Sequence, residues 1–297
     1  MSVVSVIIPC YRQAHFLDQA IDSVLEQTYP DTEVIVVDDG SPDQTSEVVR
    51  RYPQVEYIVQ ANQGLAAARN RGIEASKGEY LVFLDADDHL LPNHFGASLR
   101  AFQLKPDAAL VCGSYRLFGS IARDAQHNCD LLPDHFGTLL RWNFIGPPHV
   151  AMFKREVVSR LGGFRRGVQG CEDYDLYLRI AREHRIHCHH EVIAEYRRHE
   201  SQMSQQWGLM LFSAVHVMKS QVEHLQRHPA YHEAYCTGLR QWQRAYGVPL
   251  VWQMIGNARS RKWGRAFKDL EVLLRCFPQG LLVPLKEKVR RMTRCSA

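Results

Sequence analysis

The sequence predicts an α/β protein with a mostly parallel, Rossmann-like sheet flanked by helices and followed by a helical extension. Three observations support this prediction. Short apolar runs alternate with segments of helical spacing up to residue 112, polar clusters follow three of those runs, and the spacing is helical from Gln205 onward. Strands that are apolar throughout indicate a sheet covered on both faces. With 297 residues, 45% of them hydrophobic, the chain can bury a sizeable core.

The first elements alternate regularly between strand and helix. We expect strands at Val3–Ile8, Glu33–Val37, Val55–Val59, Glu79–Leu84 and Ala108–Cys112. Between them we expect helices at Phe16–Gln27, just after Asp43, at Leu65–Ser76 and at Asn93–Leu104. The segment Trp142–His199 is less regular and contains one clear helix after Cys171. The remainder is expected to be helical, with breaks at Pro249, Pro278 and Pro284.

Charge divides the chain into two parts. The whole chain has a net charge of +4, but residues 257–297 contain eleven Lys and Arg against three acids. That segment is therefore +8, which leaves −4 for the rest, and the asymmetry suggests separate roles. We expect one domain over residues 1–204, with halves 1–113 and 114–204, and a basic helical region over residues 205–297.

The cysteines and the apolar runs bear on the cellular compartment. Eight cysteines are dispersed without a C-x-x-C pair, so neither a zinc ribbon nor a disulfide scaffold is expected. The start, MSVVSVIIPCYRQ, has a short apolar run with no basic segment before it, and no later run reaches 18 apolar residues. We therefore expect a cytoplasmic protein, at most peripheral at the cytoplasmic face of a membrane.

Polar clusters follow three of the expected strands: Asp38-Asp39-Gly40-Ser41, Asn62-Gln63-Gly64 and Asp85-Ala86-Asp87-Asp88. In open α/β sheets, ligands bind beyond the carboxyl ends of the strands. Three clusters at one edge of the sheet therefore predict a ligand site there.

Each cluster alone also has a plain structural explanation. Asp85 and Asp87 can point the same way and suit Mg²⁺ or Mn²⁺, but Asp87 can equally serve as an acidic helix start. Asp39 can accept from a nucleobase or a ribose, or belong to an Asp-Gly turn. Asn62 can cap the next helix, whose small early residues and Arg69 also suit the binding of a phosphate.

The clusters together resemble a known family. The stretches VSVIIPCYRQAHFLDQAIDSVLEQTYPDTEVIVVDDGSPDQT, NQGLAAARNRGIEASKGEYLVFLDADD and LGGFRRGVQGCEDYDLYLRI are similar to glycosyltransferase family 2, in order and with its spacing, over about two hundred residues. The resemblance implies a GT-A fold with a nucleotide-sugar-binding half and an acceptor half. It also implies a Mn²⁺ or Mg²⁺ cofactor and inversion at the anomeric carbon.

The resemblance assigns roles to residues at the strand ends. It implies that Pro9 and Tyr11 line the nucleoside pocket, that Asp39 faces the base, and that Asp87 contacts a metal bridging the diphosphate. The implied nucleotide-sugar-binding set is Pro9, Tyr11, Asp39, Asn62, Gly64, Arg69, Asp85, Ala86 and Asp87. A metal there would stabilise the negative charge that builds on the leaving nucleotide. UDP-sugar is the expected donor because Asp39 suits a uracil edge.

The motif GCEDYDLYLRI offers the carboxylates for deprotonating an acceptor hydroxyl. Helical spacing places Asp173 on an inward stripe, and Glu172 on a polar stripe with Asp175, Arg179 and Arg182, either facing outward or as a neighbour of Asp173. An acidic first turn that favours the helix dipole explains the pair equally well. The resemblance makes the second acid, Asp173, the catalytic base.

Other candidates lie outside these motifs. His199 is expected as a further metal ligand, since the family often places a histidine there, whereas HCHH (residues 187–190) is expected to be part of a strand. Glu172 and Trp142 are possible acceptor-side residues. The stretch GLLVPLKEKVRRMTR mixes leucines with basic residues and predicts either contact with an anionic membrane or a solvated helical face.

Three classes of function compete. The preferred one is transfer of a sugar to a hydroxyl of a glycan or lipid-linked acceptor, as in polysaccharide synthesis at the cell envelope. A sugar-phosphate nucleotidyltransferase would need a Gly-rich loop after the first strand, and PCYRQAHFL has no glycine. A non-catalytic nucleotide-binding module is disfavoured because Asp87 and Asp173 occur together. No nucleic-acid partner is expected, because no nucleic-acid motif is found.

Overall fold

The structure is a computed structural model, which describes residues 3–121, 125–129, 133–200 and 202–284. The described residues form two compact units. The first comprises those up to Leu139 together with Asn143–Glu200. The second comprises Leu140–Trp142 and residues 202–284.

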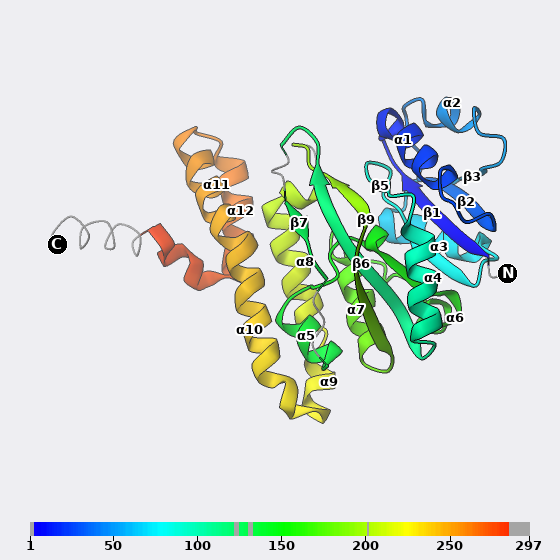
Figure 1. Cartoon of the computed structure of the whole chain (residues 1–297). Helices are drawn as coiled ribbons and strands as arrows, with labels where there is room; N and C mark the ends of the chain where they lie inside the picture. Colours follow the sequence, from blue (N-terminus) through cyan, green and yellow to red (C-terminus); the bar gives the residue numbers. More distant parts are fainter. Residues whose placement is uncertain (1–2, 122–124, 130–132, 201, 285–297) are drawn as a thin grey trace. The chain divides into compact units, whose positions relative to one another are not determined.

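The first unit begins with a parallel half-sheet, drawn from blue to cyan in Figure 1. Its spatial order is β3 (Glu56–Val59), β2 (Thr32–Asp38), β1 (Val4–Cys10) and β4 (Tyr80–Phe83), with every neighbouring pair parallel. All seven residues of β1 are buried, as expected for a strand covered on both faces. The connecting helices are α1 (Ala14–Leu25), α2 (Thr45–Val49) and α3 (Leu65–Ala75). These elements confirm the predicted ones to within a few residues.

The second half of the same sheet is mixed. Strand β8 (Ala151–Lys154) lies between β4 and β6 (Ala108–Phe118) and is antiparallel to both. Strand β9 (Arg185–Arg197) runs parallel to β6, while β5 (His89–Leu90) and β7 (Gln126–His127) pair antiparallel with β9 and β6. The predicted α/β fold is thus confirmed, and HCHH lies in a strand as expected. Four-residue β8 has too short a pattern to have been recognised from the sequence.

Short helices complete the first unit and prepare its site. They are α4 (His94–Leu104), α5 (His135–Arg141), α6 (Arg155–Arg160), α7 (Glu172–Ala181) and the 3₁₀ turn Pro148–Val150. A disulfide joins Cys129, which follows β7, to Cys188 in β9. A single disulfide is not the scaffold that the dispersed cysteines argued against, but this pair was not recognised from the sequence. The two residues are 59 positions apart, and no local pattern marks them as partners.

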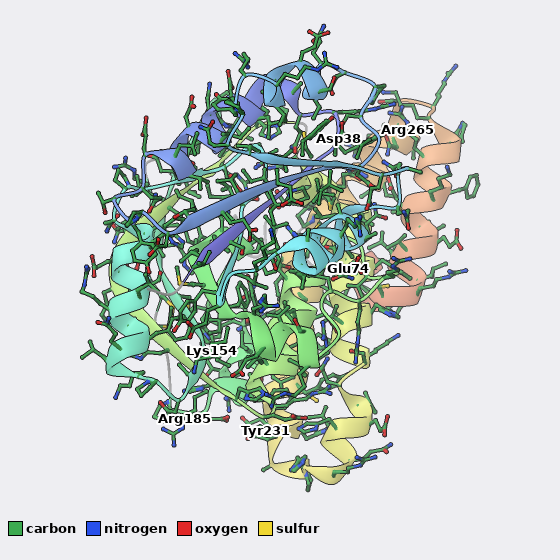
Figure 2. The ribbon with its side chains drawn as sticks, turned by 90° about the vertical axis from the view of Figure 1, so that its right-hand side faces the viewer. Asp38, Glu74, Lys154, Arg185, Tyr231 and Arg265 are labelled. Carbon is green, nitrogen blue, oxygen red and sulfur yellow. A yellow bond between two sulfur atoms is a disulfide. The ribbon has the colours of Figure 1, made fainter. Side chains whose placement is uncertain are left out.

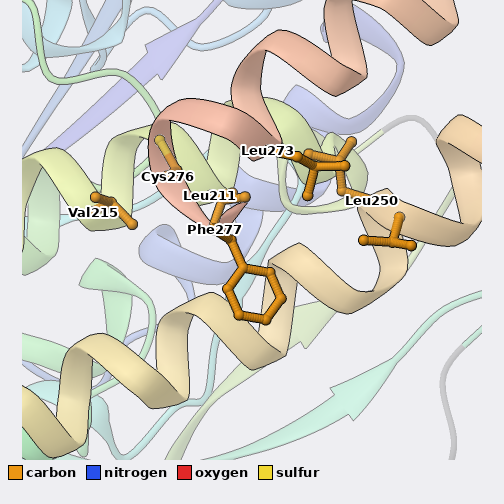
Figure 3. Packing of buried hydrophobic residues seen from close by; sticks show 7 residues of the cluster. Leu211, Val215, Leu250, Leu273, Cys276 and Phe277 are labelled. Carbon is orange, nitrogen blue, oxygen red and sulfur yellow. The ribbon is translucent and has the colours of Figure 1, made fainter. Parts of the chain in front are cut away.

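The second unit is helical, as predicted. Its helices are α8 (Trp207–Lys219), α9 (Val222–Arg227), α10 (His232–Trp242), α11 (Val248–Arg259) and α12 (Trp263–Cys276), with 3₁₀ turns at Met203–Gln205, Pro229–Tyr231 and Pro278–Leu282. Its core cluster, shown in Figure 3, consists of Leu211, Val215, Leu250, Val251, Leu273, Cys276 and Phe277.

Pro249 does not break the helix, contrary to expectation. Residues 232–259 are continuously helical, and a π-helical turn over Gln243–Gly247 lies directly before the proline. A proline inside a helix loses one backbone hydrogen bond and crowds the preceding turn. The wider π turn accommodates both effects, so α10 continues into α11.

For the end of the chain, the sequence predicts either contact with an anionic membrane or a solvated helical face. No helix among the described residues is both long enough and apolar enough to span a bilayer. The basic residues of the predicted membrane-binding stretch, Lys286 to Arg294, lie outside the described residues.

Candidate active site

The polar clusters gather at one edge of the parallel half-sheet. Strands β1 to β4 all run the same way, so their carboxyl ends share that edge. Pro9 is in the last part of buried β1, and Tyr11 follows it with 41% of its surface exposed. Figure 2 labels Asp38, the last residue of β2, whose carboxylate accepts from Tyr57 Oη at 2.6 Å. The edge therefore carries acids that follow β2 and β4, the two strands on either side of β1.

Asp39 is 3% exposed and organises the loop after β3. Its Oδ1 accepts hydrogen bonds from Gln60 Nε2 and the Gln63 backbone N–H, and its Oδ2 accepts from the Gly64 N–H, each at 2.8 Å. Gly64 precedes α3 with φ of +88°, a conformation that glycine adopts without strain. Asn62 is exposed in the same loop. Both oxygens of Asp39 therefore hold the chain that leads into α3.

Arg69 projects from α3 and is almost fully buried. Its Nη2 donates to Asp85 Oδ1 at 2.6 Å, and its guanidinium lies 5.1 Å from the Phe164 ring centre. Burial by itself lowers the pKa of Arg69, but the charges of Asp85, Glu172 and Asp173 more than offset this and raise it. Acids from two distant segments thus surround one buried cation.

Asn70 ties α3 to the loop that leads to α7. Its side-chain amide donates to the Phe164 carbonyl, and its oxygen accepts from the Phe164 N–H, both at 2.8 Å. A Cβ on Gly163 would meet the Asn70 side chain, so only glycine allows this approach. Sequence reasoning missed Asn70. The LGGF stretch was the available signal, because its two glycines permit close backbone approach.

The carboxyl pair Glu172 and Asp173 starts α7. Asp173 is partly exposed, and its Oδ1 accepts from the Tyr174 N–H at 2.7 Å. Burial raises the pKa of Asp173 to about 7, with help from Glu172 and Asp85 and against the opposing charge of Arg69. Such a carboxyl is ionised in part at neutral pH and can accept a proton from a hydroxyl.

Glu172 corrects one prediction. It is 3% exposed and accepts from the Gly170 N–H at 2.8 Å, so it does not face outward. Asp175 and Arg179, expected on the same outward stripe, are also buried, and Arg179 Nε donates to Asp175 Oδ2 at 2.8 Å. Pairing of the two charges compensates for their loss of water, so a polar stripe can pack inside the protein.

Asp87 and His199 lie side by side although 112 residues separate them. His199 Nε2 is 2.9 Å from Asp87 Oδ2, and both side chains remain slightly exposed. A small divalent ion with ligands at about 2.1 Å places neighbouring donor atoms about 3 Å apart. The pair therefore fits the predicted metal-binding role in donor type and spacing.

Sequence reasoning missed the buried support behind Asp87. Asp88 and His149 are at most 1% exposed, with Oδ2 and Nδ1 3.1 Å apart. Burial raises the pKa of Asp88 to about 7 against the opposing effect of His149. The Arg197 backbone N–H donates to Asp88 Oδ1 at 2.8 Å, and Arg197 Nε donates to the Asp87 carbonyl at 2.7 Å. These contacts hold in place the backbone that carries the Asp87 side chain.

The two remaining predicted residues are Ala86 and Trp142. Ala86 has no exposed surface. Trp142 follows α5, is 41% exposed and belongs to the second unit, so its acceptor-side role stays a prediction.

The comparison with known families matches this arrangement. The family model described as glycosyl transferase family 2 matches residues 5–162, more than half of the chain. This chain belongs to that family. An uncharacterized glycosyltransferase of Rickettsia typhi is 30% identical over 210 residues, which cover 67% of this chain and 65% of that protein. A hyaluronan synthase of Pasteurella multocida is 29% identical over 186 residues, 60% of this chain and 19% of that protein. The matches thus span less than two thirds of these relatives.

Solved structures share the fold. Staphylococcus aureus TarS, in complex with UDP-GlcNAc, has a TM-score of 0.57 at 18% identity, over 92% of this chain and 91% of that one. A mannosyltransferase of Pyrobaculum calidifontis, in complex with GDP-Man and Mn²⁺, has a TM-score of 0.58 at 21% identity, over 92% and 85%. The GT-A fold expected from the sequence is therefore confirmed.

Proposed function

We propose that this protein transfers a sugar, with inversion, from a nucleotide-diphosphate sugar to a hydroxyl of a glycan or lipid-linked acceptor. One observation carries the proposal. Asp85 at the end of the parallel half-sheet and Asp173 at the start of α7 act on the same buried guanidinium of Arg69. That the acids expected on the donor and acceptor sides of the reaction share this charged neighbour supports their assignment to one site.

Asp173 is proposed as the general base. A carboxyl with a pKa of about 7 is deprotonated in a useful fraction at neutral pH yet basic enough to take a proton from the acceptor oxygen. Inversion requires the hydroxyl to attack the anomeric carbon from the face opposite the departing nucleotide. Glu172, which is bound to the Gly170 N–H, raises the basicity of Asp173 by its negative charge.

Asp87 and His199 are proposed to hold Mn²⁺ or Mg²⁺. They offer a hard oxygen and an imidazole nitrogen 2.9 Å apart, which suits two neighbouring ligands of such an ion. A divalent cation there supplies stabilisation of the charge on the leaving diphosphate. The Asp88–His149 pair and Arg197 keep Asp87 in place from behind.

A UDP-sugar is the proposed donor, bound at the edge that Asp39 and Tyr11 share. The similar structures are complexes with UDP-GlcNAc and with GDP-Man, so both nucleotides belong in a donor panel. Mass spectrometry of the products, with several acceptors, identifies the sugar and the linkage.

The decisive experiment compares the wild type with Asp173→Asn. We expect sugar transfer and slow donor hydrolysis to fall about 10²–10⁴-fold, while nucleotide diphosphate still binds in calorimetry. Asp175→Asn is a poor control because Asp175 is buried in an ion pair, so Asp107→Asn, at an exposed position, serves instead. Unchanged turnover in Asp173→Asn contradicts the proposal. Release of pyrophosphate from a nucleoside triphosphate would instead indicate a nucleotidyltransferase.

Helix α12 supports an additional proposal, contact with an anionic membrane. Trp263, Phe267 and Leu274 are 58%, 66% and 55% exposed and are spaced four and seven residues apart, so they share one face. Lys262, Lys268 and Arg275 lie toward the sides of that face, whereas Arg265 lies on the opposite side of the helix. Exposed aromatic side chains beside basic ones suit the boundary between lipid headgroups and acyl chains.

Vesicle co-sedimentation tests this contact. We expect binding to vesicles that contain phosphatidylglycerol, little binding to pure phosphatidylcholine, and loss of binding in Trp263→Ala/Phe267→Ala. Phe212→Ala, an exposed apolar residue on α8, is the matched control. Equal binding to both lipids, or concentration-dependent self-association that the double variant abolishes, contradicts membrane contact.

A further inference from the structure

Three cysteines from distant parts of the chain meet in the first unit. Cys112 lies on β6 and is the register partner of Cys188 on β9, and Cys129 follows β7. Cys112 Sγ is 3.2 Å from Cys129 Sγ and 3.4 Å from Cys188 Sγ. All three sulfur atoms lie within 4.8 Å of one another.

The surroundings of the sulfurs are those of a small closed site. Cys112 and Cys129 have no exposed surface, while Cys188 is partly exposed. The Cys129 backbone N–H donates to Ser114 Oγ at 3.4 Å, which holds the segment after β7 against β6. Solvent and solutes can therefore reach the cluster only through Cys188, and that access is limited because Cys188 is only partly exposed.

We propose that the thiols of Cys112, Cys129 and Cys188, once the disulfide is reduced, bind one thiophilic divalent ion of the Zn²⁺ class. Thiolate sulfurs select soft or borderline ions over Mg²⁺ and Mn²⁺. Three sulfurs from three segments match a zinc site with three protein ligands, and water on the Cys188 side completes the tetrahedron. Zn–S bonds of about 2.3 Å place sulfurs about 3.8 Å apart, so small side-chain movements suffice.

The chemistry balances in two steps. A dithiol supplies two electrons and two protons, which convert the Cys129–Cys188 disulfide into two thiols while the dithiol becomes a disulfide. A phosphine instead supplies only the two electrons and becomes its oxide, while water supplies the oxygen atom and the two protons. The ion then displaces three protons, one from each thiol, and forms three metal–sulfur bonds. Burial raises the pKa of the Cys112 thiol, so this group ionises only when a cation is present to replace the proton.

The bound ion would tie β6, β9 and the segment after β7 together. The disulfide and the ion therefore exclude each other, and the redox state selects which crosslink the first unit carries. Because the ion binds the folded chain, it stabilises that unit by an amount that grows with the logarithm of its concentration over its dissociation constant.

Cobalt titration of the full chain tests the proposal. The protein is reduced with a phosphine, stripped of metal, and titrated with Co²⁺ in excess Mg²⁺, which blocks the site at Asp87 and His199. We expect an absorption band of thiolate-to-cobalt charge transfer that saturates at about one equivalent and disappears on addition of Zn²⁺. The band is sulfur-specific, so Co²⁺ bound by oxygen and nitrogen donors does not produce it.

Cysteine variants show which sulfur atoms produce the absorption band. Cys112→Ser and Cys188→Ser are expected to weaken Co²⁺ binding at least tenfold, and the oxidised wild type is expected to show no band. Cys236→Ser is the control. Cys236 Sγ on α10 lies 3.5 Å from His232 Nε2, so this pair is a second place where a sulfur atom could contact Co²⁺. No band in the reduced wild type, an unchanged band in Cys112→Ser, or loss of the band in Cys236→Ser overturns the proposal. Should a variant fail to fold, the wild-type titration in its two redox states decides.

Discussion

The two halves of the sheet differ in the sequence distance between their partners. In the parallel half, β1, β2 and β3 follow one another with single helices between them, and polar clusters end the strands. In the mixed half, β5 pairs with β9 through His89 and Glu195, and β6 pairs with β9 through Cys112 and Cys188. The first half is assembled from local units, and the second from contacts between remote segments.

This difference extends to the site. Asp39 and the loop it holds lie within 25 residues of each other. Asp87 reaches His199 across 112 residues, and Arg197 reaches the Asp87 carbonyl across 110. The contacts of Asp39 at the proposed donor edge therefore lie within the parallel half, whereas the proposed metal ligands and their support require the whole first unit.

The largest effect is expected at the buried pair behind Asp87. Asp88→Ala leaves His149 without its carboxylate partner and the Arg197 N–H without its acceptor, so we expect a loss of about 3–5 kcal/mol in the free energy of unfolding. Urea unfolding in metal-free buffer measures it.

Asp107→Ala is the matched control for this loss. Asp107 also pairs with a residue of β9, Arg185 at 3.2 Å, but both side chains are more than half exposed. An exposed pair contributes at most about 1 kcal/mol. Equal losses of unfolding free energy in Asp88→Ala and Asp107→Ala would show that the buried Asp88–His149 pair does not hold the two halves of the sheet together.

Much of the parallel half was predictable from the sequence, for a physical reason. Strands such as Val4–Cys10 are apolar throughout, and helices such as Leu65–Ala75 follow them with clear spacing. Such patterns depend only on neighbouring residues, so one sequence suffices to recognise them. The family motifs added roles for the acids at the strand ends.

The rest depended on contacts that no local pattern encodes. His149 lies in GPPHV, where nothing indicates that it meets Asp88 in the core. The orientation of Glu172 was predicted wrongly because helical periodicity assumes that charged residues face water. That assumption does not hold for α7, because Asp175 and Arg179 pair with each other inside the protein.

The next largest effect is expected at the proposed metal ligands, Asp87 and His199, which join the two halves of the sheet. His199→Ala removes one of two donor atoms, so we expect the dissociation constant for Mn²⁺ to rise at least about tenfold. Titration followed by electron paramagnetic resonance, with nucleotide diphosphate present, measures the free ion. His190→Ala, at an exposed position of β9, should leave the constant unchanged. Unaltered Mn²⁺ affinity and turnover in His199→Ala would remove the histidine from the site.

A smaller effect is expected from the pH dependence of turnover. The base must be deprotonated, and the pKa of Asp173 is raised to about 7, so kcat should fall as the pH drops through about 7. Arg69 opposes this rise in pKa by its positive charge. Arg69→Gln should therefore move the acid limb of the profile to higher pH, by about one unit.

Two observations check the origin of that shift. Arg69→Lys retains the charge and should keep the limb closer to the wild-type position. The raised pKa also means that ionisation of Asp173 costs folding stability. This cost is absent below the unfolded pKa of about 4, grows as the pH rises from there to about 7, and is constant at higher pH. Asp173→Asn should thus raise Tm most at pH 8, less at pH 5, and not below about pH 4. A limb that stays in place in Arg69→Gln contradicts the coupling between α3 and α7.

The smallest effect is expected within the parallel half, at Asp39. Asn retains one acceptor oxygen but turns an amide toward the N–H groups of the loop, so Asp39→Asn should cost about 1 kcal/mol of stability without nucleotide. The same variant separates two roles for Asp39. If the carboxylate only holds the loop before α3, binding of UDP and GDP weakens by the same factor in calorimetry. If it also accepts from the base, as the family resemblance implies, UDP loses more affinity than GDP, because the edges of the two bases differ in their donors. A change confined to one nucleotide with no loss of stability would place Asp39 at the base rather than in the loop.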